Sequence, residues 1–366
     1  MFFDEIPFLG DPNGGIARYT VELQRVLHRS GVATYGCIMG SSHLFGGRRP
    51  SEDGEWMQLP GWLRRSSMIR IFLRRAFFLK LRFCRGKDLK LVYHSTGIGS
   101  DPWIARQADV HIHTIHDLIP EKNGTAQTLK ASNAIFQRKM SLETAKGILW
   151  VSQRTKKDFR WFYPRNKLPG RVVPHGRPGP VRRGILPDSK HFLVVGKRGG
   201  YKNIEAVYHA LSLFPKSKKR PLLRVIGGGK PSDEEENLWG SLGIRNLVHW
   251  SEATEEEMPE HYRRAYGLCY PSRWEGFGFP ALEAMTYGCP VIYAKKSGVE
   301  DLVGKAGCAL SEITAPKLYG AMRKFFVFRH ARSQAILAGY KEASKFKWDT
   351  TARATLSFYE FLLKRS

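Results

Sequence analysis

Short apolar runs alternate with longer amphipathic segments along most of the chain. The runs that predict strands lie at residues 91–94, 110–114, 147–152, 172–174, 192–196, 222–227, 247–250, 267–270 and 290–294. Most are continuously apolar, which is typical of parallel strands covered on both faces. No repeat of fixed period interrupts this pattern. Strands that alternate with helical segments predict an α/β architecture.

Proline and glycine gather at residues 172–190, VVPHGRPGPVRRGILPDSK, directly before a new strand. We place a hinge there, because such segments are typical of domain boundaries. The 366 residues then divide into domain 1–176, domain 177–345 and a closing segment 346–366. We expect two Rossmann-like parallel-sheet domains that face one another across a cleft, with ligands outside the carboxyl ends of the strands.

Charge is the outlying feature of the composition. The chain is 42% hydrophobic and 12% aromatic, which excludes a disordered or fibrous protein. Its 59 Lys and Arg against 33 Asp and Glu leave a net charge of +26. Such an excess predicts an anionic partner: nucleic acid, an acidic lipid surface or a phosphorylated substrate.

The five cysteines lie far apart and form no CxxC pair, which favours neither a disulfide scaffold nor a zinc site. No basic, apolar leader opens the sequence, and no run of about 18 apolar residues occurs. We therefore expect a cytoplasmic protein.

The segment PSRWEGFGFPALEAMTYGCPV, residues 271–291, predicts a glycine-rich loop, a helix over 280–287 and a strand. Pro280 suits the first helical turn and Gly288 the end, so Glu283 is expected in the first turn and Glu275 in the loop. For Glu283 alone, favourable interaction with the helix dipole would suffice. Together, however, backbone N–H groups at the helix start and two carboxylates favour a ligand with phosphates and sugar hydroxyls.

The segment VVGKRGGYKN, residues 194–203, joins the end of a buried strand to a helix. Its glycines let backbone approach a ligand, and its cations could neutralise a diphosphate without a metal. A solvated loop is the alternative for any one of these lysines. Arg198 and Lys202 are the stronger candidates because they follow the carboxyl end of the strand.

Two segments of the N-terminal half also carry candidate chemistry. Gly14 and Gly15 in GGIARYTVEL could form a tight turn against a phosphate or sugar, or only a turn before a helix. In HIHTIHDLIP, residues 111–120, we expect His111 and His113 to be structural and His116 to act as a polar or acid/base group in the cleft. Zinc is disfavoured because no fourth ligand is evident, so no metal site is expected.

These motifs, in this order, resemble those of the GT-B glycosyltransferases of the large retaining family 4, also called glycosyl transferases group 1. The likeness is greatest to bacterial mannosyltransferase-like members. GGIARY resembles the glycine motif of that family, HDLIP its histidine loop, VGKRGGYKN its donor-phosphate loop and EGFGFPALEAMTYGCPV its E-x7-E signature. The stretch FKWDTTARATLSFYEFL, residues 346–362, looks like its closing helix, which returns to the N-terminal domain.

The resemblance implies a role for each matching residue. Glu283 would hold the donor ribose, while Arg198 and Lys202 would grip the pyrophosphate. Gly14 and Gly15 would let the N-terminal domain close on the donor. The remaining residues would contact the transferred hexose: His116 and Glu275 as catalytic groups, and Gly276, Phe277, Gly278 and Phe279 as its binding turn. The family also implies a metal-independent transfer with retention, no cofactor, and a GDP- or UDP-linked sugar as donor.

The charge gathers at residues 62–90, which hold ten Lys or Arg and one acid. On a helical wheel one broad face is apolar: Met68, Ile69, Phe72, Leu73, Ala76, Leu79 and Phe83. We expect this helix to lie on an anionic membrane through Arg70, Arg74, Arg75, Phe72 and Phe83. The alternative is a helix packed on the core with a solvated basic face.

The sequence thus predicts a glycosyltransferase that moves a hexose, with mannose from GDP-mannose favoured, to a glycan or lipid-linked acceptor. The expected process is cell-surface polysaccharide or lipopolysaccharide synthesis, at the inner face of the cytoplasmic membrane. Two alternatives stay open: a basic nucleic-acid- or membrane-binding protein, and a nucleotide-sugar epimerase or phosphorylase of related fold. Since no zinc finger, RNP, OB or helix-turn-helix pattern is present, no specific nucleic acid is expected.

Overall fold

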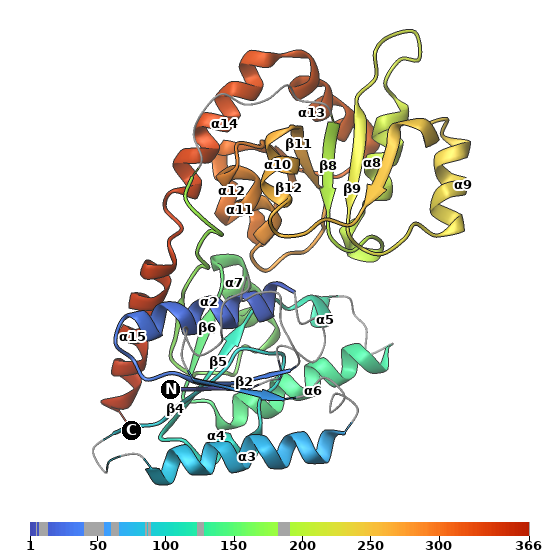
Figure 1. Ribbon diagram of the computed structural model, residues 1–366. Coiled ribbons are helices and arrows are strands. Elements are labelled where there is room, and N and C mark those ends of the chain that lie inside the picture. Colours follow the sequence, from blue (N-terminus) through green and yellow to red (C-terminus); the bar gives the residue numbers. More distant parts are fainter. Residues whose placement is uncertain are drawn as a thin grey trace. The chain divides into compact units, whose positions relative to one another are not determined.

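The computed structural model describes residues 1–4, 6, 14–39, 55–59, 66–84, 86, 89–122, 128–181 and 191–365. The chain divides into two compact units (Figure 1). The first unit is Met1–Gly176 together with Lys347–Ser366, and the second is Arg177–Phe346. Each unit holds one parallel sheet with helices against it, which confirms the predicted α/β fold with two parallel-sheet domains.

The first unit is built on a seven-stranded sheet in the order β3-β2-β1-β4-β5-β6-β7. Its strands are β1 (Phe2–Phe3), β2 (Tyr35–Met39), β3 (Glu55–Leu59), β4 (Val92–Ser95), β5 (Val110–Ile115), β6 (Gly147–Trp150) and β7 (Gly170–Val172). The last four were predicted, although β7 begins two residues early. The order reverses between β1 and β4, so the loops after these strands diverge there.

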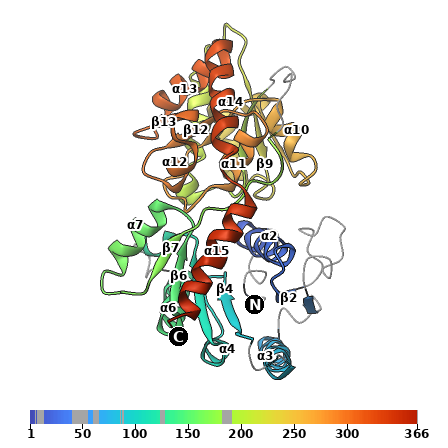
Figure 2. The ribbon, with the colours of Figure 1, turned by 90° about the vertical axis from the view of Figure 1, so that its left-hand side faces the viewer.

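Helices lie on both faces of this first sheet. They are α2 (Gly15–Arg29), α3 (Ser67–Cys84), α4 (Pro102–Gln107), α5 (Ile119–Lys122), α6 (Leu129–Thr144), α7 (Gln153–Phe162) and α15 (Trp348–Leu363). Helices α2 and α15 lie side by side and bury one cluster with β1, β4 and β5 (Figure 2). Helices α3 and α4 bury another on the opposite face. Gly147 is required beneath α15, since a Cβ there would lie 2.6 Å from Leu362.

The second unit has a six-stranded sheet in the order β10-β9-β8-β11-β12-β13. Its strands are β8 (His191–Val195), β9 (Leu222–Ile226), β10 (Val248–Ser251), β11 (Ala265–Tyr270), β12 (Val291–Ala294) and β13 (Cys308–Leu310). The order reverses between β8 and β11. This topological switch point is where α/β sheets bind ligands, because the loops after the two strands part there.

The main core of the second unit lies between this sheet and the helices α8, α9 and α13. The helices of the unit are α8 (Glu205–Ser212), α9 (Asp233–Ser241), α10 (Met258–Arg263), α11 (Phe279–Thr286), α12 (Gly298–Val303), α13 (Ala315–Val327) and α14 (Arg329–Ala343), with short 3₁₀ turns at Gly200–Lys202, Arg245–Leu247 and Gly304–Ala306.

Helix α3 lies in an orientation that the sequence did not predict. Arg70 and Arg74 are 9% and 5% exposed, and Arg74 and Arg75 both donate to the buried carboxylate of Asp101 before α4, at 2.7 and 3.0 Å. The expectation that Arg70 and Arg74 meet a membrane is therefore wrong. Phe77, Phe78 and Leu81 of the same helix pack into the core instead.

The opposite face of α3 is apolar and exposed: Met68 is 81%, Ile69 46%, Phe72 70% and Phe83 80% exposed. The alternative, a helix packed on the core with a solvated basic face, is correct in its packing. Its exposed face, however, is mainly apolar, with Lys80 among the exposed residues and Arg70 and Arg74 buried. Among the described residues, none of the helices is both long and apolar enough to span a bilayer.

Candidate functional site

The switch point of the second unit is occupied by the turn between β11 and α11. Gly278 has φ +98° and precedes the helix, which begins at Phe279 with Pro280 in its first turn. Because this glycine allows the helix to start one residue earlier than predicted, Glu283 falls beyond the first turn, which contains no acid. Placement of Glu283 in the first turn was therefore wrong. The helix ends at Thr286, before Gly288 with φ +81°.

The carboxylate of Glu283 is held by a buried tyrosine. The hydroxyl of Tyr262 donates to Oε2 of Glu283 at 2.8 Å. Burial first, and then the neighbouring carboxylate, raises the pKa of Tyr262 well above its usual value, so this hydroxyl stays a donor. Glu283 is half-buried. An ionised carboxylate so placed can accept hydrogen bonds from ligand hydroxyls.

Lys202 and Glu275, both predicted site residues, meet at the switch point. Nζ of Lys202 donates to Oε1 of Glu275 at 2.6 Å, and the two side chains are 19% and 10% exposed. The same ammonium lies 5.2 Å from the ring of Tyr201 and 5.5 Å from that of Tyr270. The loop after β8 is thereby joined to the loop after β11 by a cation that aromatic rings partly enclose.

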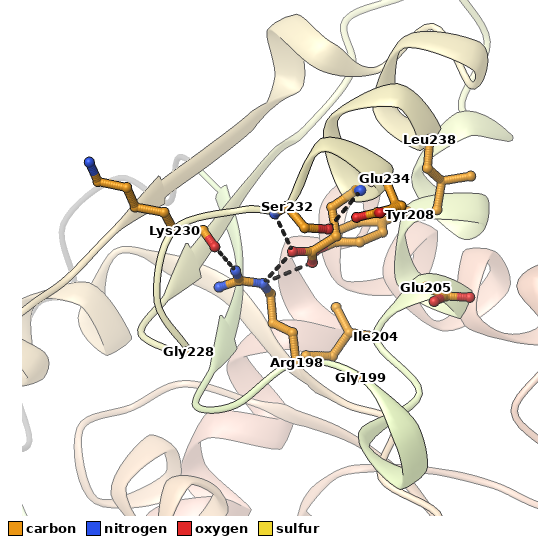
Figure 3. A pocket seen from close by; sticks show the side chains of 11 residues that line it. Arg198, Gly199, Ile204, Glu205, Tyr208, Gly228, Lys230, Ser232, Glu234 and Leu238 are labelled. Atoms are coloured by element: carbon orange, nitrogen blue, oxygen red, sulfur yellow. Dashed lines mark hydrogen bonds and ion pairs between the residues drawn. The ribbon is translucent and has the colours of Figure 1, made fainter.

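Arg198 points elsewhere, although it belongs to the same motif as Lys202. Its Nε donates to Glu235 at 2.8 and 3.1 Å, its Nη1 to the carbonyl of Gly227 at 2.7 Å and its Nη2 to the carbonyl of Lys230 at 2.9 Å. It borders a pocket of about 400 Å³ that α8 and α9 also line (Figure 3). The structure therefore does not bring Arg198 together with Glu275 and Glu283.

The turn of Gly276 to Phe279 is closely packed against the start of α12. The amide of Gly298 donates to the carbonyl of Glu275 at 2.8 Å. A Cβ on Gly298 would lie 2.0 Å from the carbonyl oxygen of Gly276, so only glycine fits there. Phe277 is 6% exposed and contacts Phe279 edge-on. These contacts hold the backbone of the turn against α12.

In the first unit, His116 follows β5 and lines a small pocket. Ile16 of α2, Asp117 and Arg138 line the same pocket. Because the carbonyl of Thr96 can only accept, Nε2 of His116 donates to it, at 2.9 Å. Burial, with a smaller contribution from the Arg138 charge, lowers the pKa of His116 to about 4. The imidazole is therefore neutral at pH 7.

Gly14 and Gly15 open helix α2 of the first unit. Gly14 is the residue before the helix, has extended backbone, and accepts from the amide of Arg18 through its carbonyl. Ile16, next along the helix, lines the pocket of His116. The start of α2 and the histidine loop thus share one pocket.

His111 and His113 are buried within the first unit. Both are hydrogen-bonded to Oγ of Ser95, at 2.9 and 2.8 Å, and His111 also to Thr144. Within the described residues there is no group of three His, Cys, Asp or Glu side chains suited to a metal.

Comparison with known proteins identifies the second unit. Residues 181–316 match the protein family described as "Glycosyl transferases group 1". The chain carries a group 1 domain and is a glycosyltransferase. The O-antigen chain mannosyltransferase B of Escherichia coli is 23% identical to it over 383 aligned residues, covering 96% of this chain and 97% of that protein.

Solved structures agree on the fold. Sucrose-phosphate synthase from Thermosynechococcus elongatus is similar with a TM-score of 0.76, at 19% identity, over the full length of both chains. WaaG, a glycosyltransferase involved in lipopolysaccharide biosynthesis, gives a TM-score of 0.72 at 17% identity over 97% of each chain. This glycosyltransferase thus has the GT-B fold predicted for it.

Two residues that hold predicted site residues were missed from the sequence: Glu235, which accepts from Arg198, and Tyr262, which donates to Glu283. Glu235 forms a capping box with Ser232 at the start of α9, and the S-x-x-E spacing was a readable signal for it. Tyr262 carries no local signal, because its contact with Glu283 depends on the packing of α10 against α11.

Proposed function

We propose that this glycosyltransferase moves a hexose from a nucleoside diphosphate sugar to a glycan or lipid-linked acceptor during cell-surface polysaccharide or lipopolysaccharide synthesis. The observation that carries the proposal is the contact of Lys202 with Glu275 at the switch point, beside the start of α11. A cation, a helix N-terminus and two carboxylates suit a ligand with both phosphates and sugar hydroxyls.

In this proposal, each residue of the second unit has one task. Lys202 neutralises the diphosphate and Glu283 accepts from the ribose hydroxyls. Glu275 and the turn from Gly276 to Phe279 hold the hexose. Departure of a nucleoside diphosphate builds negative charge, which Lys202 and the N-terminus of α11 stabilise more in the transition state than in the ground state. The transfer then needs no metal and no cofactor, and the anomeric configuration is retained.

In this proposal, residues of the first unit also act on the donor. Gly14 and Gly15, at the start of α2, let this unit close on the donor, and His116 contacts the sugar near its reacting carbon. Because its pKa is lowered to about 4, His116 contributes as a neutral hydrogen-bonding group at pH 7.

Mannose from GDP-mannose is the favoured donor. Its support is the O-antigen mannosyltransferase, which aligns over 96% of this chain. The lipopolysaccharide setting is supported by the same relative and by WaaG. UDP-linked sugar is the competing donor.

We further propose that the protein works peripherally at the inner face of the cytoplasmic membrane. The exposed apolar face of α3, rather than its arginines, would enter the lipid interface. The net charge of +26 favours approach to anionic lipid.

Binding calorimetry without metal, in EDTA, tests the donor site with GDP, UDP, GDP-mannose and UDP-glucose. We expect either the guanine nucleotides or the uracil nucleotides to bind. Glu283→Gln should weaken their affinity about tenfold, as for a lost hydrogen bond to a charged group. Glu260→Gln is the matched control, because Glu260 is an exposed carboxylate on the neighbouring helix α10. Equal affinity in the Glu283 and Glu260 variants would refute the site. A requirement for Mg²⁺ would refute metal independence.

A further inference from the structure

Two turns rich in glycine lie next to each other at the carboxyl ends of β8 and β9. In the first, Gly196, Gly199 and Gly200 have φ of +100°, +94° and +55°; in the second, Gly227 to Gly229 have φ of +79° to +82°. They touch closely, since a Cβ on Gly228 would lie 2.9 Å from the carbonyl oxygen of Gly196. Such backbone has little stiffness of its own, so side chains must hold its shape.

Arg198 joins these two turns. It belongs to the first turn, and all three of its guanidinium nitrogens donate to acceptors on the second turn or on α9: Glu235, the carbonyl of Gly227 and the carbonyl of Lys230. Its side chain is only 7% exposed. To bind a diphosphate directly, this guanidinium would have to give up its hydrogen bonds to these three acceptors, each of which would then lose its donor.

Glu235 is itself fixed from three sides. Its Oε2 accepts from the amide of Ser232 at 3.2 Å, its own amide donates to Oγ of Ser232, and Tyr208 donates to its Oε1 at 3.3 Å. The capping box anchors the carboxylate to the start of α9 and Tyr208 anchors it to α8. The acceptor of Arg198 is therefore as rigid as the helices beneath it.

The position of Lys202 depends on this contact. Lys202 ends the 3₁₀ turn Gly200–Lys202, and its amide donates to the carbonyl of Gly199, the residue after Arg198. A shift of the first glycine turn would consequently move the ammonium that faces Glu275.

We propose that Arg198 and Glu235 are positioning residues, which clamp the two glycine turns together and thereby place Lys202 for the donor diphosphate. The inference rests on the proposed function, in which Lys202 meets that diphosphate. It assigns a role to Glu235 and removes Arg198 from direct contact with the donor.

Calorimetry on the full chain, with GDP and UDP as probes, separates this role from direct binding. We expect Glu235→Ala and Arg198→Ala each to weaken the bound nucleotide about tenfold, as when an outer partner of a binding group is lost. The double variant should be no weaker than either single one, since both remove the same clamp. If Arg198 were a diphosphate ligand, Glu235→Ala would release it and leave affinity unchanged or tighter; that result overturns the proposal.

Glu236→Ala is the matched control. Glu236 is the next residue of α9 and also pairs with an arginine, Arg245, but the pair is 3.4 Å long and both side chains are about half exposed. We expect wild-type affinity from this variant. Loss of affinity equal to that of Glu235→Ala would mean that damage to α9, rather than the clamp, is being measured, and would also overturn the proposal.

Amide hydrogen exchange measures, without any ligand, whether Arg198 and Glu235 stabilise the two glycine turns. Exchange at residues 196–202 and 227–230 should rise in Glu235→Ala and in Arg198→Ala, and stay at the wild-type level in Glu236→Ala. Unchanged exchange in the first two variants refutes the clamp. If wild-type protein binds neither GDP nor UDP, the donor assignment fails, while the exchange result still decides the clamp.

Discussion

The first unit should unfold in mild acid, because this unit buries four histidines almost completely. His94, His111, His113 and His175 are between 0% and 2% exposed. Burial lowers the pKa of His94 and of His111 to about 3, and those of His113 and His175 well below the usual value. His94 is hydrogen-bonded to Thr114 and to Tyr359 of α15, so its ring joins strand and helix.

Stability falls as the pH falls, because the unfolded chain binds more protons than the folded unit. The unfolded chain takes up protons near pH 6.5, whereas the folded unit does not until the pH is far lower, so stability present above pH 6.5 is lost as the pH falls. For a folded pKa of about 3, protonation of each histidine in the unfolded chain lowers the free energy of unfolding by about 1 kcal/mol between pH 7 and pH 5.5. Four such histidines lower it by about 4–5 kcal/mol, which is close to the lower end of the stability of a whole domain.

The buried carboxylate of Asp101 does not titrate in this pH range. The arginine partners hold the pKa of Asp101 below its usual value against the opposing effect of burial, so it titrates only at lower pH. In the described part of the second unit, His191 is the one buried histidine. The first unit should therefore open before the second.

Urea titrations at pH 7, 6 and 5.5, followed by hydrogen exchange in residues 91–115, measure this effect. We expect His94→Gln to reduce the loss of unfolding free energy between pH 7 and pH 5.5 by the share of one histidine, about 1 kcal/mol. His28→Gln, at an exposed position of α2, should leave it unchanged. A loss below about 1 kcal/mol in the wild-type protein would refute the reasoning.

Three further changes test other parts of the structure. Asp101→Asn should cost about 3–5 kcal/mol in urea unfolding at pH 7, because it leaves buried guanidinium charge unpaired; a cost near zero would contradict the ion pair. Gly298→Ala should weaken nucleotide binding by displacing the turn before α11, whereas Gly320→Ala, with open space around it, should not. Phe72→Asn should weaken binding to phosphatidylglycerol vesicles about tenfold, by loss of apolar burial. Trp161→Asn, at an aromatic residue that is 80% exposed on α7, is its control, and equal losses would argue against α3 as the lipid-binding face.

The fold class was readable from the sequence because most strands are apolar runs that need no context. The strands β4 to β6 and β8 to β12 match predicted runs to within one or two residues. The strands β1, β2, β3 and β13 were missed. Phe2–Phe3 is too short for a periodic signal, and Glu55–Leu59 lies at the sheet edge with two exposed polar residues. Their pairing is decided by neighbours distant in sequence.

The site was readable only in its local parts. The loop, helix and carboxylates at residues 271–291 follow from local signals, and so does the closeness of Lys202 to a strand end. The partner of Arg198 and the orientation of α3 do not. Arg74 and Arg75 of α3 turn inward because they pair with Asp101. Asp101 lies far from them in sequence, so the hydrophobic pattern of the helix alone does not predict this pairing.

Helix α15 also fixes the order in which the two units can form during synthesis. It completes the core of the first unit: Thr351 donates to the carbonyl of Pro174, and Phe358 and Leu362 lie over Gly147. The second unit is continuous in sequence and can close as soon as residue 346 has left the ribosome, while the earlier-made first unit still lacks a helix. A chain that stops at residue 346 therefore retains a closed second unit and an open first unit, which chaperones and proteases can distinguish from the finished protein.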